Sequence, residues 1–252
     1  MRVVTVVQTK GGSGKTTTAM GIASAAMAEG EKVTMIDADV NAQLSGWRQA
    51  FEEAAWSNIE HVPWPDTLSI EPAPGSVDDL YARIEALDAE GCDLLVIDTR
   101  PGTNLDTENL ALAADVIVVP AKPVQGEWRL VVDTMNWLSK LFETLADDEA
   151  RPAARMLLTN VPPKIMSSAR RTPPFGDLTP NDRHIINTLL PLPRFDVLIA
   201  NSKILEGIAA YGPLPTAIEM RKRSPAGRIQ VGPVEDQLAA FTQLYDEIKE
   251  AI

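Results

Sequence analysis

The sequence predicts an α/β fold: a single doubly wound domain over residues 1–252, with a mostly parallel central sheet flanked by helices. Short runs rich in Val, Ile and Leu recur along the chain, which is typical of buried parallel strands. Segments with helical spacing of apolar residues separate these runs, and strands that alternate with helices build parallel sheets. The expected strands are residues 3–7, 32–36, 68–70, 93–98, 115–120, 155–160 and 190–194.

The expected helices lie between these strands. The first covers residues 18–29 and ends at Gly30, a residue suited to a helix C-cap. The last covers residues 234–252 and carries one apolar stripe, which we expect to pack against the sheet. Pro-rich segments around residues 60–74 and 170–174 predict extended loops, and residues 221–223 are expected in or beside another loop. The other expected helices are residues 41–55, 77–89, 125–145, 179–190 and 199–211.

Composition indicates an ordinary globular protein, with 45% hydrophobic and 23% charged residues. The only cysteine, Cys92, precedes an apolar run, so we expect a buried, inert thiol and no disulfide within the chain. Apolar runs stay well short of the roughly 18 residues that a membrane span needs. The first residues predict a strand and not a signal peptide, which favours a cytoplasmic location.

Charge is distributed unevenly along the chain, whose net charge is −12. Residues 164–228 hold ten Lys and Arg against five acidic residues, whereas the remainder holds 13 against 30. A strongly acidic chain disfavours nucleic acid as a partner, but a basic region can still provide a binding surface. The sequence therefore confines a nucleic-acid surface, if there is one, to residues 164–228.

A glycine-rich segment, K-G-G-S-G-K-T-T at residues 10–17, lies between the first strand and the first helix. Backbone N–H groups of such a turn converge with the helix N-terminus to bind an anion. In a phosphate-binding loop of this kind, Lys15 reaches the β- and γ-phosphates and the Thr16 hydroxyl ligates Mg²⁺. Thr9 stands where the common motif has its first glycine, and Lys10 is an additional lysine. The segment predicts a nucleotide site.

Acidic residues follow two of the expected strands. Asp37 and Asp39 come after the second, and Asp98 ends the apolar run 94–97. The carboxyl ends of parallel strands share one crevice with the phosphate loop. An apolar strand that ends in Asp is the Walker B arrangement, which places a carboxylate beside Mg²⁺ and its waters.

These motifs resemble the ParA/MinD family of deviant-Walker ATPases over essentially the whole chain. The family loop matches residues 10–16, its D-x-D motif matches Asp37 and Asp39, and its Walker B strand matches residues 94–98. The spacing from Asp37 to Trp47 looks like that of small ParF-type partition ATPases and of VirC-type ATPases of T-DNA transfer. One departure is Val40-Asn41, where partition ATPases usually have Pro-Gln. It puts the switch geometry in question.

The resemblance implies a role for each matched residue. Lys10 would cross a dimer interface to the partner's nucleotide, and Asp39 would orient the attacking water. Asp37 and Asp98 would support Mg²⁺ with Thr16, and the turn from Asp98 through Gly102 would sense the γ-phosphate. Asn160 would read adenine at a strand end. The nucleotide would be held by Gly11, Gly12, Ser13, Gly14, Lys15, Thr16 and Thr17.

The resemblance further implies a slow ATPase that forms an ATP-dependent homodimer, is stimulated by a ParB-like adaptor, and binds non-specific DNA in its ATP state. Such a protein segregates or positions a plasmid or another cargo, and the sequence leaves the cargo open. It would be nucleoid-associated when ATP-bound. The expected DNA contacts are Arg194, Arg221, Lys222 and Arg223.

Two other functions fit the same fold. A MinD-like ATPase attaches to membranes through a basic amphipathic C-terminal helix, but the last expected helix here has five acidic residues against Lys249 alone. No stable membrane association is therefore expected. A metabolic enzyme could transfer phosphate or electrons to a small substrate. Its iron–sulfur relatives need two cysteines per chain, and its synthetase relatives lack a lysine at the position of Lys10.

Overall fold

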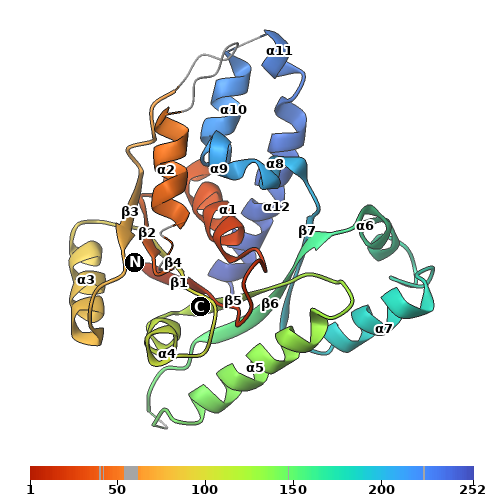
Figure 1. Cartoon of the computed structure of the whole chain (residues 1–252), viewed down its shortest axis with the longest axis horizontal. Helices are drawn as coiled ribbons and strands as arrows, with labels where there is room; N and C mark the ends of the chain where they lie inside the picture. Colours follow the sequence, from red (N-terminus) through yellow and green to blue (C-terminus); the bar gives the residue numbers. More distant parts are fainter. Residues whose placement is uncertain (40, 42, 54–61, 147, 224) are drawn as a thin grey trace.

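The computed structural model describes residues 1–39, 41, 43–53, 62–146, 148–223 and 225–252. Its centre is one seven-stranded sheet in the order β3-β2-β4-β1-β5-β6-β7 (Figure 1). Every strand pair is parallel, which confirms the predicted fold class. The strands are β1 Arg2–Val6, β2 Val33–Asp37, β3 Leu68–Pro72, β4 Leu94–Asp98, β5 Val116–Ala121, β6 Ala153–Val161 and β7 Arg194–Ala200.

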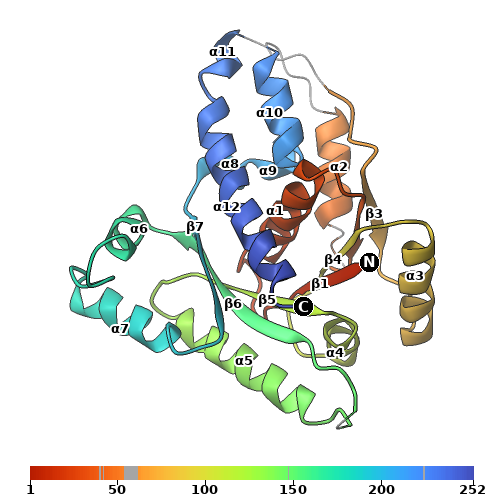
Figure 2. The same ribbon diagram turned by 180° about the vertical axis from the view of Figure 1, so that it is seen from behind.

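Helices cover both faces of the sheet (Figures 1 and 2). Helices α1, α2, α10 and α12 share one apolar core with one face of the sheet, whereas α3, α4, α5 and α7 form a second core on the other. The helices are α1 Lys15–Ala28, α2 Gln43–Glu53, α3 Val77–Ala89, α4 Leu105–Leu112, α5 Trp128–Phe142, α6 Pro163–Ala169, α7 Pro180–Leu189, α8 Lys203–Glu206, α9 Ile208–Tyr211, α10 Leu214–Lys222, α11 Pro225–Arg228 and α12 Val231–Lys249.

The sequence prediction is wrong between residues 190 and 211. The expected strand 190–194 is the turn after α7, and β7 runs from Arg194 to Ala200 because Phe195, Val197 and Ile199 alternate into the core. The expected helix 199–211 begins later, with α8 at Lys203, and the hydroxyl of the N-cap residue Ser202 accepts the Ile204 N–H. Gly207 then separates α8 from α9.

Other differences are smaller. Helices α4, α6, α10 and α11 were not expected. Residues 221–223 were expected in or beside a loop, and Arg221 and Lys222 end helix α10. The predicted helix 41–55 corresponds to α2, and its last two residues lie outside the described ranges. The predicted Cys92 thiol is buried and free.

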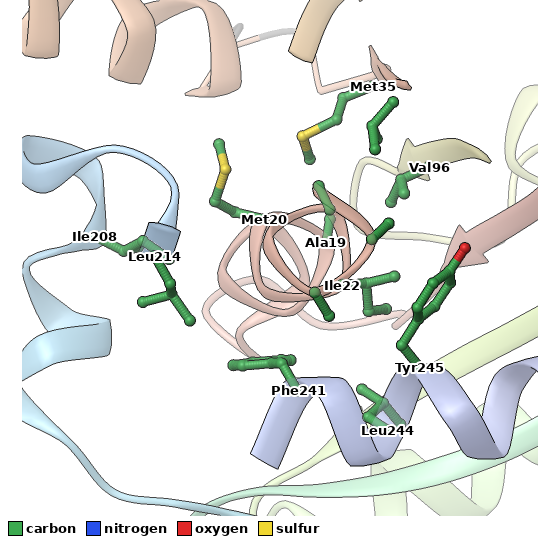
Figure 3. Packing of buried hydrophobic residues seen from close by; sticks show 14 of the residues in the cluster. Ala19, Met20, Ile22, Met35, Val96, Ile208, Leu214, Phe241, Leu244 and Tyr245 are labelled. Carbon is green, nitrogen blue, oxygen red and sulfur yellow. The ribbon is translucent and has the colours of Figure 1, made fainter. Parts of the chain in front are cut away.

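Helix α1 is enclosed by the core on nearly all sides (Figure 3). Met35 and Val96 of the sheet lie on one side, and Phe241, Leu244 and Tyr245 of α12 lie on the other. At Gly21, an added Cβ would stand 2.2 Å from the Phe241 ring, so only glycine allows α12 this close approach. The apolar stripe of α12 thus packs on α1 and α10 as well as on β7.

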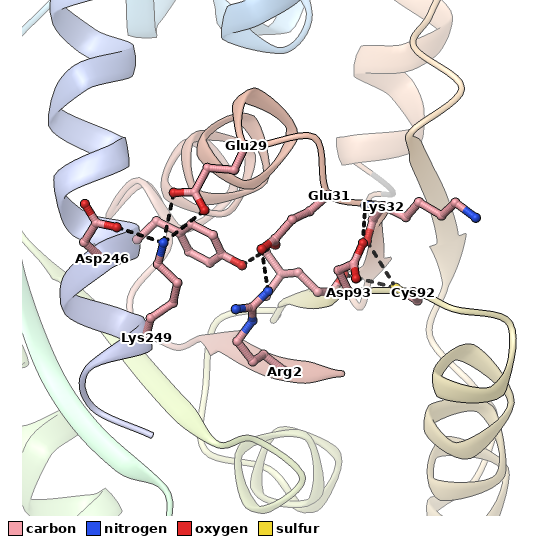
Figure 4. Close-up of polar contacts among 10 residues, drawn as sticks. Arg2, Glu29, Glu31, Lys32, Cys92, Asp93, Asp246 and Lys249 are labelled. Atoms are coloured by element: carbon pink, nitrogen blue, oxygen red, sulfur yellow. Dashed lines mark hydrogen bonds and ion pairs between the residues drawn. The ribbon is translucent and has the colours of Figure 1, made fainter.

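A polar network at the amino edge of the sheet fixes α12 to the start of the chain (Figure 4). Glu31 accepts hydrogen bonds from Arg2 at 2.6 Å and from the Tyr245 hydroxyl at 2.5 Å. Lys249 pairs with Glu29 at 2.9 Å and with Asp246 at 2.8 Å. Because α1 and α12 are fixed here, the loop at the opposite, carboxyl edge starts from a rigid support.

Candidate nucleotide site

The loop between β1 and α1 has the backbone shape of an anion-binding nest. Gly12 and Gly14 adopt left-handed conformations, with φ of 74° and 96°. Gly14 is the N-cap of α1 and provides no side-chain oxygen, so the first N–H groups of the helix stay available to a ligand. Lys15 and Thr16 lie in the first helical turn and are buried. The predicted strand–loop–helix context is therefore present.

This loop forms one wall of a cavity of about 520 Å³. Asp39 and Asn41 line it after β2, and Thr159 and Asn160 line it from the last residues of β6. Asn160 has a left-handed φ of 52°, a conformation that asparagine tolerates better than most residues. The cavity brings together the predicted Gly11, Gly12, Ser13, Gly14, Lys15, Thr16, Thr17, Asp39 and Asn160.

Asp98 is buried at the carboxyl end of β4, beside the loop. Among the described residues, neither of its carboxylate oxygens accepts a hydrogen bond. Burial raises the pKa of this carboxyl to about 7, against the opposing effect of the Thr16 hydroxyl and the Lys15 ammonium group. Burial also lowers the pKa of Lys15, and the carboxylate of Asp98 opposes that shift. The buried Ser13 hydroxyl is likewise unpartnered in the described chain. Such atoms suit a phosphate and its metal ion.

Asp37 has a structural task in addition to its predicted role near Mg²⁺. Its Oδ2 accepts the N–H groups of Leu44 at 2.9 Å and Ser45 at 3.3 Å, and Oδ1 accepts the Asp39 N–H at 3.2 Å. Asp37 thereby fixes the start of α2 to the end of β2. The Thr16 hydroxyl donates to Gln43 Oε1 at 3.1 Å, so the first residue of α2 also reaches the proposed metal ligand.

Asn41 holds the carboxylate of Asp39. Its backbone N–H and its Nδ2 each donate to Asp39 Oδ1 at 2.9 Å. This residue belongs to the Val40-Asn41 departure, and Val40 itself lies outside the described residues. The sequence indicated that this position was unusual but not that its amide would contact Asp39.

Lys10 extends away from the main cavity. Its side chain is 49% exposed, and Nζ lies 3.4 Å from Glu127 Oε1 before α5. Lys10 and Lys15 therefore face different directions although both belong to one loop. On the other side of the loop, Gly102 has a φ of 119° in the turn after Asp98, which lets this turn pass close to Gly11 through Pro101.

The structure does not gather the four predicted DNA contacts, and for Arg221 the prediction is wrong. Arg221 is 3% exposed, because its guanidinium lies 4.3 Å from the centre of the Tyr211 ring and donates to the Ala217 carbonyl. Arg194 pairs with Asp196, Lys222 with Glu235 and Arg223 with Glu219.

The contacts with α12 show that Lys222 and Arg194 lie far from one another. Lys222 contacts the helix near its start, at Glu235, whereas β7 beside Arg194 contacts it near its end, at Glu247. Twelve residues of helix between these acids correspond to about 18 Å.

No helix in the described ranges is both long and apolar enough to cross a membrane.

A parallel sheet with this loop, and with acidic residues at the same edge, defines a P-loop ATPase of the ParA/MinD family. Residues 1–252 match the family model described as VirC1 protein, and the chain belongs to that family.

Curated relatives agree with this assignment. Protein virC1 of Rhizobium radiobacter is 27% identical over 194 residues, which cover 77% of this chain and 74% of the relative. The maintenance of carboxysome distribution protein A of Gloeobacter kilaueensis is 32% identical over 171 residues, 67% of each chain. The chromosome-partitioning ATPase Soj of Thermus thermophilus is 30% identical over 172 residues, 62% of this chain and 67% of the relative.

Solved structures share the fold. The MinD cell division protein of Aquifex aeolicus has a TM-score of 0.61 at 17% identity, covering 95% of this chain and 98% of that one. Apo McdA from Cyanothece also has a TM-score of 0.61, at 15% identity, covering 100% and 99%. The chain therefore belongs to a family of ATPases, and proteins related to it act in partition and positioning.

Proposed function

We propose that this chain is an ATPase that dimerises when it binds ATP and positions a plasmid or other cargo through an adaptor protein. The observation that carries the proposal is that the two lysines of the loop point in different directions. Lys15 faces the cavity of its own chain, whereas the half-exposed Lys10 points outward. Lys10 could exchange its 3.4 Å ion pair with Glu127 for a contact with the nucleotide of a second chain, which would make the bound nucleotide part of the interface.

The site fits ATP and Mg²⁺. Solved structures with this fold include an McdA–ATP complex and a Mg-ADP complex of MinD from Pyrococcus horikoshii. In this chain, Thr16 and Asp98 would hold the metal, with Asp37 supporting it from the end of β2. Bound Mg²⁺ would neutralise charge on the phosphates. Lys15 would hold the phosphates, Asp39 would orient the attacking water, and Asn160 would read the adenine.

Dimerisation is tested by sedimentation velocity with ATP, with ADP and without nucleotide. Wild type should dimerise with ATP only. Lys10→Ala should remain monomeric while it still binds ATP, because the change removes the contact across the interface. A surface control on α5, Lys140→Ala, should behave as wild type. A Lys10→Ala dimer at saturating ATP would refute the role of Lys10.

Asp39→Ala should accumulate as an ATP-bound dimer, because removing the carboxylate that orients the water stops hydrolysis but spares nucleotide binding. Phosphate release and sedimentation, measured on the same sample, check this. A variant that stays monomeric under saturating ATP would contradict the assignment of Asp39.

Non-specific DNA binding in the ATP state is the further part of the proposal. Lys222 and Arg223 at the end of α10 are the candidate contacts, with Arg194 on β7. Each pairs with an acidic residue, so we expect weak binding that dimerisation strengthens by doubling the number of phosphate contacts. Gel shifts on random-sequence DNA should show binding with ATP alone. Equal binding in all nucleotide states, or in none, would contradict it.

The membrane alternative has less support. Phe241, Leu244 and Ile248 of α12 are buried against the core, so the apolar stripe of this helix is not available to lipid. Its exposed residues include Glu235 and Asp236, which anionic lipid would repel.

A further inference from the structure

Lys122 contacts the phosphate loop from outside the motif. It follows β5, and its Nζ donates a hydrogen bond of 2.5 Å to the carbonyl oxygen of Gly12. The same side chain lines the cavity that holds Lys15 and Asp39. No pattern in the sequence marks this residue, because 110 positions separate it from its partner.

The end of β5 is fixed to the base of the loop, which makes this contact reproducible. Strands β1 and β5 pair in register at Val6 and Val118. Gln8 Nε2 donates to the Pro120 carbonyl at 3.1 Å, and Gln8 Oε1 accepts the Thr9 N–H at 2.8 Å. Lys122 therefore extends from a rigid position two residues beyond Pro120.

The hydrogen bond determines the orientation of one peptide group. In a planar trans peptide, the Gly12 carbonyl and the Ser13 N–H point in opposite directions. Gly12 has a φ of 74°, no side chain of its own and open space where a Cβ would stand, so glycine itself restricts the rotation of this peptide little. Lys122 provides the missing restraint by holding the carbonyl, and the Ser13 N–H is turned the other way.

We propose that Lys122 is a positioning residue that orients the Gly12–Ser13 peptide so that its N–H faces the bound phosphates. This inference rests on the proposed nucleotide site and deepens it. Because Lys122 acts through the loop and not on the terminal phosphate, its loss should weaken the binding of nucleoside diphosphates and of nucleoside triphosphates to the same extent.

The test measures the dissociation constants of fluorescent mant-ADP and of a non-hydrolysable mant-ATP analogue on the full chain. Lys122→Met keeps the length of the side chain but removes the donor, and both constants should rise about tenfold. Lys122→Arg keeps a donor and should remain within about threefold of wild type. Lys140→Met, an exposed change on α5, serves as the matched control.

Hydrogen exchange of the loop without nucleotide gives a second readout. Lys122→Met should speed exchange at the amides of residues 13–15, whereas a purely fold-level effect would shift the melting temperature and leave this difference small. Unchanged affinity in Lys122→Met would overturn the inference, and so would a loss limited to the triphosphate, which would indicate a γ-phosphate contact instead. Failure of wild type to bind either nucleotide would overturn the proposed function itself.

Discussion

At the scale of single residues, the main feature of the site is the carboxyl group of Asp98, which is buried away from water. Asp98 has no exposed surface, and among the described residues its carboxylate has no hydrogen-bond donor. Burying an ionised carboxylate is costly unless it is paired. The protein therefore holds a group that is unfavourable in the free chain and becomes favourable when a cation arrives.

This cost predicts a pH dependence for the protein free of nucleotide and metal. Asp98 keeps its proton up to a pH of about 7 in the fold but loses it near its ordinary pKa of 3.8 in the unfolded chain. Between these pH values the folded state binds one proton more at Asp98 than the unfolded state does. The contribution of Asp98 to stability therefore falls as the pH rises from about 4 to 7. Asp98→Asn does not titrate, so it should gain on the order of 2–4 kcal/mol over wild type across this range.

Urea unfolding in EDTA at several pH values measures this difference, and phosphate release should show that the stabilised variant has lost ATPase activity. Parallel stability curves for the two proteins would contradict the prediction.

At the scale of elements, α1 connects the site to the core. Its first turn carries Lys15 and Thr16, and its middle is held between the sheet and α12 at Gly21 (Figure 3). A shift of α12 at this contact would therefore press directly on the helix that presents the loop. Helix α2 has the complementary role, because Asp37 and Gln43 connect its start to the carboxylates and to Thr16.

Two glycine substitutions separate packing from helix propensity. Gly21→Ala should lower the free energy of unfolding by about 1–3 kcal/mol, because the new methyl group would overlap the Phe241 ring 2.2 Å away. Gly46→Ala, on the exposed side of α2 with nothing within 4 Å, should raise it by about 0.5–1 kcal/mol. Chemical denaturation measures both, and equal effects at the two sites would show that the contact with Phe241 is unimportant.

At the scale of the whole molecule, net charge opposes assembly. Each chain carries −12, so two chains repel one another, and both repel DNA except near their cations. Salt screens both effects, but it also weakens attraction to phosphates.

Raising the salt concentration from about 50 to 300 mM should therefore strengthen ATP-dependent dimerisation and weaken DNA binding. Sedimentation and fluorescence anisotropy at matched salt concentrations measure the two separately. If dimerisation and DNA binding change in the same direction, repulsion between the acidic chains does not limit dimerisation while attraction to phosphates drives DNA binding, as we suggest.

The sequence was sufficient for features whose physics is local. The phosphate loop, Asp39, Asp98 and the central strands each follow from a run of adjacent residues. It was insufficient where distant segments meet. The burial of Arg221 depends on Tyr211 of another helix, and the contacts made by Gln43, Glu127 and Lys122 bridge wide gaps in the chain.

Element boundaries failed for a related reason. The apolar residues of 190–193 resemble a strand, but the next segment alternates better and pairs with β6, so β7 begins at Arg194. Helix α4 spans only eight residues and depends on its cap, Asn104, whose Oδ1 accepts the Thr107 N–H at 3.1 Å. Short elements of this kind have little periodicity to detect.

The cavity is lined by residues from both ends of the chain: loop residues such as Gly14, and Phe241 of α12. A ribosome makes the loop early and α12 late. Until residue 241 has emerged, the cavity lacks one wall and α1 lacks its cover at Gly21. A nascent chain that ends before residue 241 would therefore lack this wall of the nucleotide site, so synthesis would keep unfinished copies out of the proposed ATP-dependent dimer.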